Sequence, residues 1–218
     1  KETLAIEKYN GKFTFYVFHD WLYSSDPDIF EILEGGFYQE ALGHGRNTDF
    51  DAYHRAEKEG LIKWSPLAKG ICNIFEDIFI ELAASKLYPS VPTALLRTVE
   101  LLTAKGFFGE SDNFDKMGET HCLTTGLLNF CRGKLLPGQD QYLQANMHAL
   151  VPILQAKLGS VWDQVWEVAK ECANSTCTMD NILLTSKVLD IIQSTSESEP
   201  KNESNDDQGS ENDKAEGE

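Results

Sequence analysis

The sequence predicts a mostly α domain with a small β element near its start and a disordered acidic C-terminal tail. Three observations support this fold class. Apolar residues recur at helical spacing in successive segments from residue 26 to residue 193, one run near the N-terminus has the character of a strand, and the residues after 193 include a single apolar side chain, Ala215.

The β element is predicted at 12–18, "KFTFYVF". Its aromatic and β-branched residues follow Asn10 and Gly11, a pair that is common in tight turns between strands. No other segment has an equally clear strand pattern, so the rest of the domain is expected to be helical.

The first helix is predicted over 26–43. Ser25 or Asp26 can cap its first turn, and Pro27 fits a position where no helical hydrogen bond is lost. A glycine pair at 35–36 interrupts the pattern and argues against a straight helix. The apolar stripe of this helix consists of Ile29, Ile32, Leu33, Phe37 and Leu42.

Two further helices are predicted before residue 90. One covers 49–60, with Asn47 or Thr48 as its cap. The next covers 67–88 and is closed by Pro89. This third helix is apolar around most of its circumference, which is typical of the buried centre of a domain.

Five more amphipathic segments complete the domain, separated by short turns of Gly, Pro and Asn. They are predicted at 92–105, 120–132, 140–159, 160–173 and 179–193. The folded domain is therefore expected to span 1–193. The composition of 194–218 cannot bury enough surface to offset the entropy of ordering it, so this part is expected to be a disordered acidic linker.

Charge and hydropathy exclude two classes of partner. The formal net charge is −16, part of it in the linker, and no run of Lys or Arg could neutralise phosphates, so no nucleic-acid partner is expected. No apolar run reaches the roughly 18–20 residues that span a bilayer, and no signal-peptide pattern opens the chain. The protein is expected to be cytoplasmic, without a membrane partner, and to be a fragment of a longer protein, because it ends within a charged spacer.

The cysteines indicate an intracellular protein. They are odd in number, and none forms a C-x-x-C pair of the kind found in zinc ribbons and redox sites. Reduced thiols are therefore expected. The five cysteines are Cys72, Cys122, Cys131, Cys172 and Cys177.

Polar residues interrupt the apolar third helix in "NIFEDIFIE". Asn73, Asp77 and Glu81 are spaced four residues apart and therefore share one helical face, with Glu76 beside it. Buried carboxylates this close together resist ionisation unless a cation, hydrogen bonds or water compensate them. The face is expected either to be solvated or to have a positive group on it, and Glu81 is expected to be a supporting or solvated acid.

A metal site is one interpretation of these acids. In "EALGH", Glu40 and His44 are four residues apart and share a helical face if the first helix continues that far. With Glu76 or Asp77 they would form a set of one imidazole and two carboxylates, which suits zinc or a similar divalent ion and leaves a position for water. The predicted metal ligands are thus Glu40, His44, Glu76 and Asp77. The other interpretation is a partly exposed His44 at a helix end, beside a solvated acidic face.

Two segments resemble the cobaltochelatase T-subunit family and its phage relatives, which join a zincin-like helical region, an acidic spacer and a C-terminal von Willebrand A domain. In that family one helix has H-E-x-x-H and then, after three residues, T-D-F; a later helix has N-x-x-E-D-x-x-I-E. The segments "EALGHGRNTDFD" and "NIFEDIFIE" match these motifs in order and at a compatible separation. Thr48 and Asp49 stand at the family's T-D, although capping of the next helix also accounts for them. The resemblance is specific over 37–81 and implies a zincin-like helical domain.

The match fails at the catalytic position. If His44 is the second histidine of H-E-x-x-H, Glu40 takes the place of the first, and Ala41 takes that of the glutamate that accepts a proton from metal-bound water. Ala41 cannot accept a proton, so the resemblance then implies a degenerate metallopeptidase motif that could still bind a metal but would lack peptidase chemistry. In an alternative register, Glu40 is the family's glutamate and one residue is inserted before His44.

The resemblance also implies a partner. Members of the family act with a hexameric AAA+ ATPase of the MoxR type, and this chain has no G-x-x-x-x-G-K-[ST] loop for nucleotide of its own. The leading expectation is the N-terminal module of a cobaltochelatase-T-like protein of a bacterium or phage, linked to the ATPase by its von Willebrand A domain. One alternative is a metal-dependent hydrolase in which Glu40 or Asp77 is a displaced base. Another is a purely structural helical domain without metal.

Overall fold

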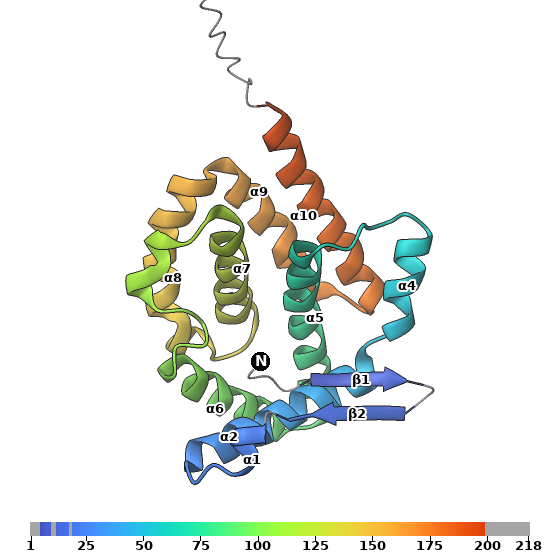
Figure 1. The fold of residues 1–218 in the computed structure, drawn as a ribbon, viewed down its shortest axis with the longest axis vertical. Helices are drawn as coiled ribbons and strands as arrows, with labels where there is room; N and C mark the ends of the chain where they lie inside the picture. Colours follow the sequence, from blue (N-terminus) through green and yellow to red (C-terminus); the bar gives the residue numbers. More distant parts are fainter. Residues whose placement is uncertain (1–4, 10–11, 18, 199–218) are drawn as a thin grey trace, which may run out of the picture.

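The computed structural model describes residues 5–9, 12–17 and 19–198. These residues are mostly helical, as predicted, with one small β hairpin (Figure 1). Most of the predicted acidic linker, 199–218, lies outside the described residues, as does the predicted turn at Asn10 and Gly11. No helix in the described part of the chain is long and apolar enough to span a membrane.

The hairpin pairs β1 (Ala5–Tyr9) with β2 (Lys12–Tyr16) in antiparallel register, with Ala5 opposite Tyr16. The second strand was predicted, and Phe18, the predicted end, lies outside the described residues. The first strand was missed because "AIEKY" has two charged residues and no aromatic run, so its strand character depends on the partner strand.

The first long helix, α2 (Pro27–Phe37), follows a short α1 (His19–Leu22). Its cap is Asp26, as predicted: the carboxylate accepts a hydrogen bond from the Asp28 N–H at 3.0 Å. The glycine pair that interrupts the apolar pattern lies inside α2, and the change to another type of helix comes after it, at Tyr38. Gly35 is required there by the close approach of α6 (Val91–Ala104), because a Cβ on Gly35 would lie 1.7 Å from Thr98 Oγ1.

Gly35→Ala is expected to destabilise the domain by about 1–3 kcal/mol, because α2 and α6 must move apart to admit the methyl group. Gly70→Ala is a matched control inside another helix, where the new Cβ would make only an ordinary contact at 4.0 Å with Thr124. This control is expected to be neutral or to stabilise by about 0.5–1 kcal/mol. Urea denaturation of both variants tests the difference, and equal stabilities would contradict it.

The helix α4 (Phe50–Lys58) begins one residue later than predicted and has a different cap. The Asp49 carboxylate accepts from the Asp51 N–H at 3.1 Å, so the cap is neither Asn47 nor Thr48. Those two side chains have other partners, in or next to the preceding segments η1 (Tyr38–His44) and α3 (Gly45–Asn47). The Asn47 amide donates to the Leu42 carbonyl, and the Thr48 hydroxyl is hydrogen-bonded to His44.

The central helix of the domain is α5 (Pro66–Leu87), capped by Ser65. All five residues from 74 to 78 are buried, and five successive residues go fully around an α-helix. The helix contacts η1, α7 (Glu119–Leu135), η3 (Lys170–Asn174) and α10 (Thr178–Ser198), and Figure 1 shows it between α7 and α10. The prediction that this helix is the buried centre is confirmed.

The remaining elements are η2 (Ser111–Lys116), α8 (Asp140–Leu158) and α9 (Ser160–Ala169). The segment predicted as one helix over 160–173 changes after Ala169 into the 3-10 helix η3. The last helix, α10, continues past its predicted end at 193, since neither Gly nor Pro occurs before Pro200.

The main core lies between α5, α7, α8, α9 and α10. All five cysteines are free thiols, and only Cys177 is exposed. Trp166 stacks on Trp162 with 6.3 Å between ring centroids. The core includes Ile71, Phe75, Leu127, Leu150, Leu154, Trp162 and Val165.

Candidate functional site

The segment with Glu40 and His44 is a π-helix, η1, and not the α-helix that the sequence predicts. The Gly45 N–H bonds to the Glu40 carbonyl five residues earlier, so this turn holds one residue more than an α-helical turn. A Glu–His spacing of four in a π-helix therefore corresponds to a spacing of three in an α-helix. That is the spacing in E-x-x-H, so the geometry suits the alternative register with one inserted residue.

Tertiary contacts hold the π-helical turn in place. Gly43 lies so close to α5 that a Cβ would be 2.9 Å from Ile80 Cδ1. The Asn47 amide donates to the carbonyls of Leu42 and Gly43 at 3.0 Å each, which satisfies acceptors at the end of the turn. The turn therefore depends on α5 and on Asn47 as well as on its own sequence.

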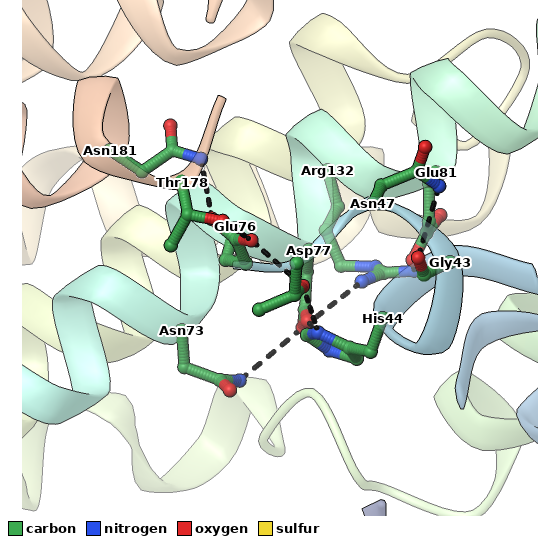
Figure 2. A network of polar contacts seen from close by, with 11 residues as sticks. Gly43, His44, Asn47, Asn73, Glu76, Asp77, Glu81, Arg132, Thr178 and Asn181 are labelled. Carbon is green, nitrogen blue, oxygen red and sulfur yellow. Dashed lines mark hydrogen bonds and ion pairs between the residues drawn. The ribbon is translucent and has the colours of Figure 1, made fainter. Parts of the chain in front are cut away.

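His44 contacts Asp77 of α5 directly and is connected to Glu76 of the same helix through Thr48 (Figure 2). Its Nε2 is 3.2 Å from Asp77 Oδ1, and its Nδ1 is 2.9 Å from Thr48 Oγ1. The Thr48 hydroxyl in turn donates to Glu76 Oε1 at 2.8 Å. The His44 side chain is 12% exposed, so the ring is close to the surface but not freely solvated.

Glu76 is the fully buried end of this chain of hydrogen bonds, with 0% of its surface exposed. Besides Thr48, Oε1 accepts from the Thr178 hydroxyl and Oε2 from the Asn181 amide, both at 2.8 Å. All three donors are neutral and two come from α10. Glu76 therefore ties α5 to α10 and to the turn after η1.

The directions of these hydrogen bonds determine the protonation of His44. Thr48 has one hydroxyl proton and gives it to Glu76, so it can only accept from His44, and Nδ1 must carry a proton. Nε2 faces a carboxylate oxygen of Asp77, which also accepts. Either His44 is a doubly protonated imidazolium, or a cation takes the place of the Nε2 proton.

The electrostatic surroundings agree with a charged ring. Burial by itself would lower the pKa of His44, but the hydrogen bond and charge of Asp77, together with the charges of Glu40 and Glu76, raise that pKa above 6.5. Because the folded pKa is raised, the stabilisation by protonated His44 is fully present below pH 6.5 and is lost as pH rises through the folded pKa.

A pH series tests this account. Both proteins are measured in the presence of a chelator. The parent's free energy of unfolding is expected to exceed that of His44→Gln by an amount that shrinks as pH rises from about 6 to about 9. The variant has no group that titrates at this position, so it isolates the effect of His44 from the rest of the protein. Parallel stability curves, measured by urea denaturation, would show that His44 does not carry this charge.

A second group of charges lies beyond Asp77. Asp77 Oδ2 is 3.5 Å from the Asn73 amide nitrogen and 4.0 Å from a guanidinium nitrogen of Arg132. Arg132 bonds Glu81 at 2.6 Å and Gln139 at 3.1 Å. Of the two expectations for this face, a positive group rather than solvent compensates Asp77 and Glu81, whereas neutral donors compensate Glu76.

Glu81 is thus a supporting acid, but it is not solvated. It is 2% exposed, and burial raises the pKa of its carboxyl above the ordinary value even with Arg132 beside it. The Gln139 amide donates to its second oxygen at 3.3 Å. Glu81, Arg132 and Gln139 therefore form a closed polar group between α5 and the end of α7.

The four predicted metal ligands occupy different positions in this arrangement. His44 and Asp77 are in direct contact, and their 3.2 Å separation is close to the roughly 3.3 Å between two ligands of a tetrahedral zinc ion. Glu76 reaches His44 only through Thr48, so Asp77 is the carboxylate that faces the ring. Glu40 is close enough for its charge to raise the pKa of His44, but it also lines an apolar cavity beside Phe37.

The donor set fits a divalent ion in part. Within residues 5–9, 12–17 and 19–198, no three His, Cys, Asp or Glu side chains form a group arranged to hold a metal. Two of the predicted ligands are nevertheless positioned as a pair, and a metal ion in place of the Nε2 proton would satisfy both. Metal binding stays a prediction, resting on His44 and Asp77 with Glu40 as a further carboxylate.

Several residues of the site were missed by the sequence predictions. Arg132 and Gln139 follow α7 or lie near its end, and Thr178 and Asn181 open α10, so they are remote in sequence from the acids that they bind. One general signal existed: buried carboxylates need hydrogen-bond donors, so other segments of the chain had to supply them.

Comparisons with known proteins add no relative. A scan against protein-family models, a search of curated proteins and a search of solved structures each gave no significant match. The likeness to the cobaltochelatase T-subunit family therefore rests on two segments of this sequence, and those two segments are the ones that meet around His44.

Proposed function

We propose that this chain is the N-terminal, zincin-like module of a cobaltochelatase-T-like protein, which binds a divalent cation at His44 and Asp77 without acting as a peptidase. The observation that carries the proposal is the convergence of the two motif segments. His44, Thr48, Glu76 and Asp77 are separated by up to 33 positions in sequence, yet they form one chain of hydrogen bonds.

The surroundings of His44 suit a metal ligand. Thr48 accepts a hydrogen bond from the Nδ1–H and donates one to buried Glu76, so the ring is fixed with Nε2 directed at Asp77. Ligating histidines are commonly oriented in this way, by a hydrogen bond from the other ring nitrogen. A bound divalent ion would supply positive charge between Nε2 and Asp77, where the imidazolium proton otherwise lies.

The partner in this proposal is a MoxR-type AAA+ ATPase. Its support is the sequence resemblance together with the lack of a nucleotide-binding loop in the chain. The acidic residues after α10 would connect this module to a von Willebrand A domain of the full-length protein, and the assembly would work in the cytoplasm.

Two measurements test the proposal separately. Zinc competition with a chromophoric chelator is expected to show binding that is at least about tenfold weaker in His44→Ala and Asp77→Ala. Pull-down of the full-length protein with the ATPase from the same genome is expected to recover the ATPase. Absence of zinc binding would reject the cation site, and absence of the ATPase would reject the partner.

A metal-dependent hydrolase is the second candidate, and the π-helix favours it. In the register with one inserted residue, Glu40 takes the place of the proton-accepting glutamate and Gln39 that of the first histidine. The test is zinc-dependent hydrolysis of a casein digest. If the parent hydrolyses it and Glu40→Gln does not, although the variant still binds zinc, the hydrolase would replace the proposal. Zinc binding without hydrolysis supports the proposal.

A further inference from the structure

A cavity of about 420 Å³ lies between α4 and α5, beside the His44 site. Tyr53, His54 and Glu57 of α4 line one side, and Trp64, Lys69 and Asn73 line the other. Asn73 connects the cavity to the site, because its amide donates to Asp77. A concave space with aromatic walls and a few polar groups beside charged buried residues is typical of a ligand site.

The aromatic walls present ring surface and not polar atoms. The Trp64 indole N–H donates to the Tyr53 carbonyl at 3.3 Å, and the Tyr53 hydroxyl is hydrogen-bonded to the buried Cys72 thiol. The two ring centroids are 5.6 Å apart and the rings are tilted by 54°. With their donors engaged inside the protein, these residues offer a ligand their π faces, which attract cations.

Two of the polar residues that line the cavity offer acceptors. One N–H of the Asn73 amide donates to Asp77, which leaves the Asn73 carbonyl oxygen to accept from a ligand. Glu57 adds an exposed carboxylate at the rim. Behind the wall, burial and the charges of Glu76 and Asp77 raise the pKa of Tyr53.

Two lining residues oppose a cation. Lys69 and His54 are both exposed at the rim, where their side chains can turn toward water. The half-buried lining residues are the aromatic pair, Tyr53 and Trp64. A planar, positively charged donor matches that surface better than an anion or an apolar group does.

We propose that this cavity binds the guanidinium group of an arginine side chain, presented by a basic segment of a partner protein. Charge complementarity supports this occupant, because the chain has a formal net charge of −16 and would attract a basic partner. The inference goes beyond the cation site at His44 and does not depend on it, since none of the groups that would contact the arginine is a proposed metal ligand.

The test uses nuclear magnetic resonance of the whole chain in excess chelator, so that metal has no part in it. The probe is N-acetylarginine amide, followed by the indole N–H signal of Trp64, which Trp64→Phe identifies. This signal is expected to shift with millimolar affinity, and the neutral isostere N-acetylcitrulline amide is expected to bind at least about threefold more weakly. Equal binding of the two probes, tighter binding of N-acetylglutamate amide, or no shift would overturn the proposal.

Charge variants at exposed positions add a matched control. Glu57→Gln is expected to weaken arginine binding about threefold, whereas Glu59→Gln, which removes the same charge just outside the cavity, is expected to leave it unchanged. Lys69→Met is expected to strengthen binding, because it removes the opposing cation. Equal effects of the two glutamate variants would indicate general attraction to an acidic protein, and weaker binding in Lys69→Met would indicate an anion site; either result would overturn the proposal.

Discussion

Glu76→Ala is expected to destabilise the domain by about 3–5 kcal/mol. The substitution removes an acceptor that is completely buried and leaves the hydroxyl protons of Thr48 and Thr178 and the amide N–H of Asn181 without their acceptor. It also removes the group that fixes Thr48, and with it the orientation of His44. Urea denaturation at neutral pH measures the loss.

Glu76→Gln is the matched control, since it keeps the shape of the side chain and one accepting oxygen. It is expected to cost less than Glu76→Ala, because two of the three donors meet the same oxygen, Oε1. A loss below about 1 kcal/mol in Glu76→Ala would show that water replaces the carboxylate and that the hydrogen-bond chain does not hold the fold.

Arg132→Met is expected to destabilise the domain by about 3–5 kcal/mol, because it leaves the carboxylate of Glu81 buried without its cation. It also removes positive charge near Asp77, 4.0 Å away. The side chain of Met reaches about as far as the arginine Nε, so it keeps the packing of the aliphatic stem and removes the guanidinium with its charge and hydrogen bonds. Thermal and urea denaturation measure the effect.

A double variant separates the pair from its surroundings. Arg132→Met with Glu81→Leu is expected to recover most of the loss, because the double replacement leaves neither charge buried. Gln139 then loses partners at both ends, so recovery is expected to be incomplete. If the double variant lost as much as the sum of the two single variants, the stabilising role assigned to the pair would be wrong.

Much of the fold could be predicted because local signals were strong. The apolar run with Pro89 after it identified α5 as the central helix, and the side chains of Asp26 and Ser65 start helices as their residue types favour. The π-helix could not be predicted from periodicity. Its extra residue depends on the contact of Gly43 with Ile80, which belongs to a helix more than 30 positions later.

Part of the candidate site could also be predicted, because some of its residues have strong local signals. His44 and Asp77 stood out because a histidine and a buried carboxylate each have a clear local pattern, and the structure brings them together. The partners that neutralise and hold the acids, Arg132 and Asn181, come from helices that no local pattern links to α5. Only the need of a buried carboxylate for donors indicates that such residues must exist.

The metal content of the purified protein tests the proposed cation site most directly. Elemental mass spectrometry is made on untagged protein purified without chelator, beside His44→Ala, Asp77→Ala and the exposed control His54→Ala. The account predicts about one divalent ion per chain in the parent and the control, and its loss from both site variants. A parent protein without metal, or one that keeps its metal in His44→Ala and Asp77→Ala, would contradict the account.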